Sequence, residues 1–503
     1  MPELNEWAAT NPDRLAIVSE AGDRTYAELD ANANRLARAL AARGLAPGDA
    51  VALIAPNEPA FVETVAACAR GGFRLTPVNW HLTADEAGYI VDDCEAKALV
   101  ASVRLTDIAR GCLEHAPACK VALLAGGEAA GFEPYEAALE AETDDPVFEE
   151  LNGGTMLYTS GTTGRPKGVH RPPAPRAGQI NLYGYVEEGG DVHLCTGPLY
   201  HAAPLAFSLA IPLFFGCTVV LMDHWDASET LRLIEAHGVT HTHMVPTMFH
   251  RLLALPDDER ASADLSTLRH ILHGAAPCPV AVKQRLIEWV GPIVVEYYAA
   301  TEGVGSFVDS ATWLAHPGTV GKPIVEGQVV IGDDAGTPLP AGEVGLVFLR
   351  APGAAAFTYY KDEDKTASAY RGDYFTLGDV GYLDEEGYLF LTDRSANLII
   401  SGGVNIYPAE VDAVLLEHPA VGDAAVIGVP DEEWGESVLA VIELRQGVAA
   451  SPALAEELVE HCRDHLSHFK CPRRVEFVDR LPREDNGKIY KRRLREQFRA
   501  QSS

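Results

Sequence analysis

The residues from Tyr158 to Gly168 read YTSGTTGRPKG and have the composition of a phosphate-binding loop. Hydroxyl-bearing residues alternate with glycines, and Lys167 follows them, so backbone N–H groups, side-chain O–H groups and one cation can all face phosphate oxygens. The segment is not a Walker A loop, because it does not contain the pattern G-x-x-x-x-G-K-[ST]. Taken alone, a loop of serine, threonine and glycine is more often an ordinary surface turn.

Further segments decide between these two interpretations. They are, in chain order, RLTPVNWHLTADE at 74–86, PLYH at 198–201, HGAAPC at 273–278, YYAATEG at 297–303, YFTLGDVGYLDEEGYLFLTDR at 374–394, LIISGGVNIYPAEV at 398–411 and LPREDNGKIYKRRLRE at 481–496. With the phosphate loop they resemble, in order and spacing, the motifs of the adenylate-forming superfamily, which includes acyl-CoA synthetases, carrier-loading adenylation domains and luciferases. The resemblance covers nearly the whole chain and is greatest to the acyl-CoA synthetases.

The resemblance implies a ligase reaction in two steps. A carboxylate attacks the α-phosphate of ATP to give acyl-AMP and pyrophosphate, and the thiol of coenzyme A then takes the acyl group. Negative charge builds on the phosphoryl oxygens and on the departing pyrophosphate, so positioned cations and hydrogen-bond donors must do most of the work. Mg²⁺, ATP and coenzyme A are therefore the implied cofactor and co-substrates.

The nucleotide site implied by the resemblance draws on several motifs. Thr301 would contact the α-phosphate, and Glu302 would help to hold Mg²⁺, which commonly uses one or two carboxylates with phosphate oxygens and water. Asp379 would bind the ribose with Arg394 beside it. The phosphates and the base would be held by Thr159, Ser160, Gly161, Thr162, Thr163, Gly164 and Lys167, and by Gly274, Ala275, Ala276 and Tyr298.

Lys488 lies in DNGKIYKRR near the end of the sequence. An isolated lysine in such a place is usually a solvated surface charge, but here Asn486 and Gly487 predict a tight turn that aims the next side chain. By resemblance Lys488 is the catalytic lysine that bridges the carboxylate and the α-phosphate, and Thr301 and Glu302 complete the catalytic set.

The acyl-binding residues implied by the resemblance begin at His201, which would line the pocket near the carboxylate. Amino-acid-activating relatives place an aspartate near this position, and PLYHAAPLAF at 198–207 has none, so an amino acid substrate is disfavoured. Small residues gather where the pocket should be, which indicates either room for a medium-to-long or ring-bearing acid or ordinary packing. The predicted pocket residues are His201, Ala202, Ala299, Ala300 and Gly303, and Gly402 and Gly403 would border the channel for the pantetheine thiol.

The elements that must position these residues have readable patterns. Thr25 to Gly44 predicts a helix with a capping box at Thr25 and Glu28, and 451–466 predicts another with Ser451 as its cap. Apolar runs at 51–56, 345–349 and 424–429 predict strands, and the first has the composition of a strand in a parallel sheet. The uncharged stretch 204–222 reads as a buried helix followed by a strand rather than a membrane span.

The length of 503 residues exceeds what one core supports, so we expect at least two domains. The fold class is α/β, and the resemblance implies a large N-terminal multi-layer α/β domain at 1–394 and a small C-terminal α+β domain at 395–503. The small domain would turn on a hinge at Ser395, Ala396 and Asn397. Its last 41 residues, from Arg463, carry 12 Lys and Arg against 6 Asp and Glu, which suits either a solvated surface or a lobe closing over an anionic ligand.

Composition excludes several classes of partner. The formal charge of −32 repels nucleic acid and anionic lipid. Nine scattered cysteines without a CxxC pair indicate a reducing compartment and no zinc or disulfide framework, and no secretion signal is apparent, so we expect a cytoplasmic enzyme. The sequence does not decide whether two copies of the chain form a homodimer.

Two other functions stay open at this point. One is an adenylating ligase that passes the acyl group to an amine or to the phosphopantetheine of a carrier protein, and the other is a nucleotide- or acyl-binding regulator without turnover. The joint presence of Lys167, Glu302, Asp379 and Lys488 argues against the regulator, because binding alone needs no lysine from a second domain.

Overall fold

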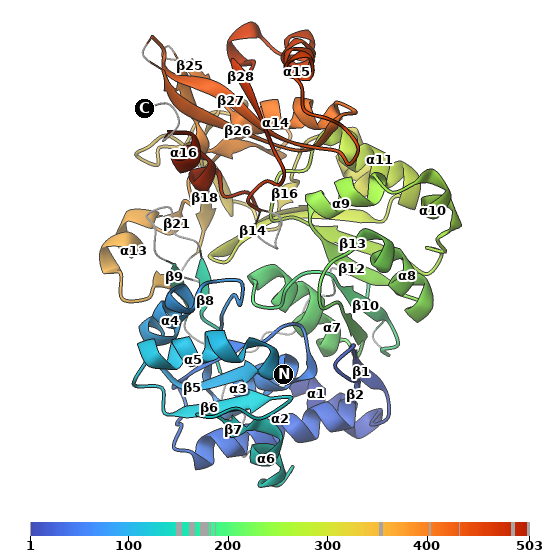
Figure 1. The fold of residues 1–503 in the computed structure, drawn as a ribbon, viewed down its shortest axis with the longest axis vertical. Coiled ribbons are helices and arrows are strands. Elements are labelled where there is room, and N and C mark those ends of the chain that lie inside the picture. Colours follow the sequence, from blue (N-terminus) through green and yellow to red (C-terminus); the bar gives the residue numbers. More distant parts are fainter. Residues whose placement is uncertain are drawn as a thin grey trace.

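The computed structural model describes residues 2–146, 153–159, 166–171, 181, 183–186, 188–351, 356–401, 404–431, 433–483 and 488–499. Within these ranges the strands form five sheets, and helices cover them in layers. Figure 1 shows the N-terminal elements (blue to cyan) at one end of the molecule and the elements from β24 onwards (orange to red) at the other. The predicted α/β fold class is confirmed.

The largest sheet carries the predicted residues from Gly274 to Ala276 and from Tyr298 to Gly303, after β13 and along β14 and β15. Its strands from β14 to β1 run parallel, and antiparallel strands close both edges. In spatial order they are β16 (Lys322–Pro323), β15 (Gly303–Val308), β14 (Val294–Ala300), β13 (His270–His273), β12 (His241–Met244), β10 (Val192–Cys195), β11 (Thr218–Leu221), β1 (Leu15–Val18) and β2 (Arg24–Thr25).

Four smaller sheets complete the fold. An all-parallel sheet holds β4 (Arg74–Pro77), β3 (Ala50–Ile54), β5 (Ala96–Ser102), β6 (Val121–Ala125) and β7 (Glu133–Pro134). Two antiparallel sheets follow: β19 (Thr358–Tyr359), β9 (Lys167–His170) and β8 (Leu157–Thr159), then β20 (Tyr370–Arg371), β21 (Tyr374–Phe375), β18 (Gly345–Arg350), β22 (Asp379–Leu383), β23 (Leu389–Arg394) and β17 (Val329–Gly332). The last sheet holds β25 (Val404–Ile406), β24 (Ile399–Ser401), β27 (Gly435–Leu444), β26 (Val421–Asp431) and β28 (Arg474–Val478).

The helices bury apolar faces against these sheets. Those before residue 260 are α1 (Pro2–Thr10), α2 (Tyr26–Ala42), α3 (Pro59–Gly71), α4 (Ala84–Asp93), α5 (Thr106–His115), α6 (Tyr135–Glu140), α7 (Ile211–Phe214), α8 (Ala227–His237) and α9 (Pro246–Leu253). The later ones are α10 (Asp257–Ser262), α11 (Val280–Val290), α12 (Ser310–Ala315), α13 (Glu363–Ala369), α14 (Pro408–Glu417), α15 (Pro452–His465) and α16 (Lys491–Arg499).

The helices predicted from local signals are confirmed. Thr25 caps α2 through the reciprocal capping box with Glu28, and Ser451 caps α15 by accepting a hydrogen bond from the backbone N–H of Leu454. The uncharged stretch 204–222 forms a π-helical segment at Pro204–Ala210, then α7 and β11, all within the fold. No helix among the described residues combines the length and apolarity that a bilayer crossing needs.

The apolar strands differ in the direction of their pairing. β3 pairs with β4 and β5 in parallel, as predicted. β18 and β26, whose apolar runs are similar, pair with antiparallel neighbours instead. β26 is apolar along its length because its two faces pack into two separate buried clusters, one containing residues of α14 and α15 and the other residues of α16. A continuous apolar run therefore reports burial on both faces rather than strand direction.

Two hydrogen bonds connect β23 and the segment after it to the C-terminal elements. The Asp393 Oδ2 atom accepts a hydrogen bond of 2.8 Å from the backbone N–H of Ala409, at the start of α14. Arg495 Nη1 donates to the carbonyl oxygen of Ala396 over 2.7 Å. The predicted boundary between residues 394 and 395 falls among these contacts, and it stays a prediction.

All nine cysteines are free, and burial raises the pKa of each thiol above its ordinary value. Among the described residues, no group of three or more His, Cys, Asp and Glu side chains has the geometry to hold a metal ion.

Candidate active site

Asp379 is the centre of a compact polar corner at the start of β22. Its Oδ2 atom accepts a hydrogen bond of 2.7 Å from the hydroxyl of Tyr298 on β14, and its Oδ1 atom accepts one of 2.9 Å from Arg394 Nε on β23. Asp379 and Arg394 are register partners in the β22–β23 pair, so the strand pairing itself sets this contact. The Asp379 carboxylate raises the pKa of the Arg394 guanidinium, which is therefore a fixed cation.

Glu302 forms a second polar corner in the turn between β14 and β15. Glu302 is 6% exposed, and this burial raises the pKa of its carboxyl group. The positive charges of Lys488 and Arg394 act in the opposite direction and lower that pKa. The Tyr359 hydroxyl on β19 donates a hydrogen bond of 3.1 Å to Glu302 Oε1. A buried carboxylate among cations is suited to hold a divalent cation that takes its other ligands from phosphate and water.

Lys167 lies next to the Glu302 corner. Its Nζ atom is 5.6 Å from the centre of the Tyr359 ring, and burial lowers the pKa of its ammonium group. Lys167 on β9 is the register partner of Thr159 on β8, so this hairpin joins the two ends of the predicted phosphate loop. Of that loop, Ser160, Gly161, Thr162, Thr163 and Gly164 lie outside the described residues.

The loop after β13 approaches the same corner from the other side. A side chain at Gly274 would lie 2.6 Å from the backbone oxygen of Tyr297, so only glycine fits there. Ala275 has a φ of 70°, which L-residues rarely adopt, and Ala276 follows it. The loop therefore lies directly against the strand that carries Tyr298.

Thr301 is half-buried in the turn between β14 and β15, next to Glu302. Lys488 is exposed, and its positive charge favours the ionised form of Glu302, which lowers the pKa of that carboxyl group. Ala299 and Ala203 pack against the same buried cluster. His201 and Ala202 immediately precede Ala203 in the sequence. Ala300 pairs with Gly303, but a side chain on Gly303 would meet Phe375, which belongs to a different cluster. Gly402 and Gly403 are outside the described residues.

Sequence reasoning missed two residues of this site. Tyr359 binds Glu302, and only the aromatic run at 357–360, which reads as a strand, points to it. The second residue is Arg171, which follows β9 in the chain. Burial lowers the pKa of its guanidinium group, and the negative charge of Glu302 acts in the opposite direction by favouring the charged form. The Nε atom of Arg171 has no hydrogen-bond partner among the described residues.

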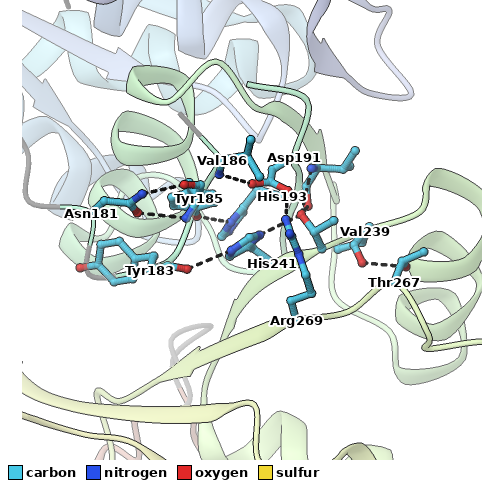
Figure 2. Close-up of polar contacts among 12 residues, drawn as sticks. Asn181, Tyr183, Tyr185, Val186, Asp191, His193, Val239, His241, Thr267 and Arg269 are labelled. Carbon is cyan, nitrogen blue, oxygen red and sulfur yellow. Dashed lines mark hydrogen bonds and ion pairs between the residues drawn. The ribbon is translucent and has the colours of Figure 1, made fainter. Parts of the chain in front are cut away.

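A layer of histidines and aromatic rings lies across the largest sheet, at the amino ends of β10, β12 and β13. His193, His241 and His270 form a row across β10, β12 and β13, and the ring of His243 is 2.9 Å from the Tyr297 hydroxyl. Figure 2 shows Tyr183 and Tyr185 beside His193 and His241, where the Tyr185 hydroxyl contacts His193 Nδ1 at 2.9 Å and the Tyr183 carbonyl contacts His241 Nε2 at 3.0 Å.

Burial makes this histidine layer electrically neutral near pH 7. It lowers the pKa of His243 to about 3 and the pKa values of His241 and His270 to about 4. The pKa of His193 is lowered well below its ordinary value for the same reason. The layer therefore consists of aromatic faces and neutral imidazoles, and the ion pair between Asp191 and Arg269 lies beside His241.

Two family models match the chain. The model for the AMP-binding enzyme covers residues 4–360, and the model for the AMP-binding enzyme C-terminal domain covers residues 410–488.

Curated relatives match over almost the whole length. A feruloyl-CoA synthase from Amycolatopsis sp is 35% identical over 508 residues, which cover 98% of this chain and 99% of that protein. The long-chain-fatty-acid–CoA ligase FadD13 from Mycobacterium tuberculosis is 32% identical over 519 residues, covering 99% and 98%.

Solved structures agree with this similarity. The anthranilate CoA ligase AuaEII in complex with anthranoyl-AMP superposes with a TM-score of 0.88 and 26% identity, over 100% of this chain and 97% of that one. The amide bond synthetase McbA from Marinactinospora thermotolerans superposes with a TM-score of 0.82 and 28% identity, over 99% of both chains. The chain belongs to the AMP-binding enzyme family, the adenylate-forming enzymes that its motifs resemble.

Proposed function

We propose that the protein is an AMP-forming acid–thiol ligase that converts a carboxylic acid to its acyl-CoA through an acyl-AMP intermediate. The observation that carries the proposal is the convergence of five strands on one site. β9, β14, β19, β22 and β23 bring Lys167, Tyr298, Tyr359, Asp379 and Arg394 together around Glu302.

In the first step the nucleotide would be held by these groups. Asp379 would accept hydrogen bonds from the ribose hydroxyls, and the loop at Gly274–Ala276 with Tyr298 would frame the base. Lys167 and Thr159 would face the β- and γ-phosphates. Lys488 would bridge the attacking carboxylate and the α-phosphate, where one preorganised donor is worth roughly 10²–10³ in rate.

Mg²⁺ fits this arrangement because Glu302 is a buried carboxylate, the hard oxygen ligand that Mg²⁺ combines with phosphate oxygens and water. The ion would neutralise charge on the phosphates, as divalent cations do in phosphoryl chemistry. Glu302 would hold it, and Tyr359 would orient the Glu302 carboxylate through its hydrogen bond.

In the second step the pantetheine thiol attacks the acyl carbon and displaces AMP, so that acyl-CoA, AMP and one proton leave. We expect the small domain to turn on the hinge after Arg394, withdrawing Lys488 and presenting Gly402 and Gly403 to the thiol channel.

A cytoplasmic location, suggested by nine free thiols, and a homodimer are further expectations of this proposal.

The acyl group would be uncharged and would extend from His201 past Ala299. The apolar surroundings of Ala299 support this, because Ala299 packs with Ala203 and Phe207 against the buried cluster that contains Tyr297, where a charged tail would be desolvated. A medium-to-long or ring-bearing acid fits such surroundings better than an amino acid.

The decisive experiment is ATP–pyrophosphate exchange with a panel of carboxylic acids, followed by product analysis with three acceptors. We expect exchange that depends on Mg²⁺, AMP and pyrophosphate as first products, and a thioester when CoA is added. ADP and orthophosphate as first products, or fastest exchange with a free amino acid, would overturn the proposal. Acyl transfer to an amine or a carrier protein in preference to CoA would identify the alternative ligase.

A further inference from the structure

A buried ion pair lies directly beneath the loop that follows β13. Lys283 Nζ on α11 is 2.6 Å from Glu296 Oε2 on β14, and their side chains are 0% and 6% exposed. A third side chain, His273, ends β13 with 0% exposure, and its Nε2 atom is 3.7 Å from the same oxygen. Neither ring nitrogen of His273 has a hydrogen-bond partner among the described residues.

Glu296 is connected to both ends of this loop. At the first end, His273 is the register partner of Glu296 in the β13–β14 pair. At the other end, Lys283 lies in the first turn of α11, and its backbone N–H donates to the carbonyl of Pro279. The loop from Gly274 to Pro279 is therefore held at its start by strand pairing and at its end by the ion pair.

Glu296 also lies two residues before Tyr298 on the same face of β14. Tyr298 donates its hydroxyl to Asp379, and the loop contains Gly274, which lies against the backbone of Tyr297, and Ala275 in its unusual backbone conformation. One buried carboxylate thus fixes the loop relative to the tyrosine and, through it, to the aspartate.

Stability alone does not explain why two charges are buried here. Desolvation of a buried ion pair costs about as much as the pair returns, and apolar replacements of similar volume are often neutral or stabilising. Breaking such a pair from one side is costly, because the remaining charge stays buried. What an ion pair does supply is a short, directional contact that apolar packing does not provide.

We propose that Lys283 and Glu296 are positioning residues for recognition of the adenine base, acting through the loop at Gly274–Ala276 and through Tyr298. The inference rests on the proposed function, because it names what aligns that nucleotide site. Its prediction is specific: loosening the pair weakens discrimination of the base but leaves the acid pocket and the reacting groups in place.

The test uses a double variant that removes both charges together, Lys283→Met with Glu296→Leu. We expect its thermal midpoint to stay within a few degrees of the natural protein, because neither charge is left unpaired. We expect the KM for ATP to rise by about tenfold, the size of one positioning contact, and the preference for ATP over GTP to fall. The KM for the acid and the rate at saturating ATP should change by less than about twofold.

The matched control is another buried carboxylate paired with an arginine. Glu63 is 1% exposed and lies 2.8 Å from Arg24 Nε, in a different part of the fold. Arg24→Met with Glu63→Leu should lower thermal stability, because Glu63 also accepts hydrogen bonds from Asn32 and Tyr135, but it should not change the KM for ATP. A second variant, Glu296→Asp, keeps the charge but shortens the contact, and should raise the KM for ATP in the same direction.

Three results would overturn the inference. The first is an unchanged KM for ATP in the folded double variant or, if that variant does not fold, in Glu296→Asp. The second is an equal rise in the KM values for ATP and the acid, which reports a general loss of structure. The third is an equal effect of the control pair. Failure of the natural protein to catalyse ATP–pyrophosphate exchange would instead count against the proposed function.

Discussion

Replacing Asp379 with asparagine should separate the ribose corner from the rest of the fold. The Asp379 carboxylate uses both oxygens, one for Tyr298 at 2.7 Å and one for Arg394 at 2.9 Å, and its side chain is 11% exposed. Asparagine offers one acceptor oxygen and one NH₂ group, so one contact is lost and the attraction of Arg394 disappears. Since a hydrogen bond to a charged group is worth about 1.5–3 kcal/mol, we expect a loss of about 2–4 kcal/mol.

The proposed hydrogen bonds from the ribose hydroxyls lose the same charged acceptor, and a loss of about 2–4 kcal/mol in transition-state binding corresponds to a fall of about 30- to 1000-fold in kcat/KM for ATP. The assay is initial-rate pyrophosphate release with ATP varied at saturating acid, paired with thermal unfolding of the same preparation. Asp191→Asn is the matched control, because Asp191 is 3% exposed, pairs with Arg269 and accepts a hydrogen bond of 2.7 Å from the backbone of Val186. If both variants lowered kcat/KM for ATP equally, the reasoning that places Asp379 at the ribose would be refuted.

Three further predictions concern other parts of the molecule. Lys488→Ala should slow acyl-AMP formation by about 10²-fold or more, while supplied acyl-AMP is still converted to the thioester. Gly403→Trp should leave acyl-AMP formation intact and block the conversion of acyl-AMP to the thioester. Equal losses in both single-turnover steps would contradict the two-conformation mechanism. Tyr359→Phe removes a hydrogen bond that lowers the pKa of Glu302, so the acid limb of the kcat/KM profile for ATP should move to higher pH, and an unmoved limb would count against the role of Tyr359. Acidification should destabilise the protein, because histidines whose pKa values are depressed in the fold contribute stability at neutral pH that is lost as the pH falls; they are His193, His241, His243, His270 and His273. For His241, His243 and His270, denaturant unfolding at pH 7 and pH 5 should reveal a loss of about 2 kcal/mol each. Equal stabilities at the two pH values would refute this prediction.

Local signals allowed the sequence to predict much of the fold and the pairing of Asp379 with Arg394. The capping box at Thr25 and Glu28 depends on residues three apart, and it appears in α2 as expected. Asp379 and Arg394 lie 15 residues apart in one hairpin, so a single continuous motif contains both. Signals of this kind survive because the contact is made within the segment that carries the pattern.

Contacts set by strand register were not predictable. Tyr359 reaches Glu302, 57 residues away, only because β19 pairs with β9. The row of His193, His241 and His270 depends on the mutual register of three parallel strands, which the spacing of histidines within each strand does not specify. Lys283 and Glu296 stand in apolar stretches of α11 and β14, and neither stretch indicates that the two charges meet. The antiparallel pairing of β26 was not predictable either, because its apolar composition reflects burial on both faces and does not depend on the direction of the neighbouring strand.

The cysteines offer a practical route to testing the proposed rotation of the small domain. At neutral pH alkylating dyes react with thiolate, and all nine native thiols are free but shielded, with raised pKa values. A cysteine introduced on the exposed face of α15 and another on α10 should therefore take up maleimide fluorophores ahead of the native thiols, without first constructing a cysteine-free background. Energy transfer between the two dyes would then report the angle between the large and small parts of the chain during each turnover.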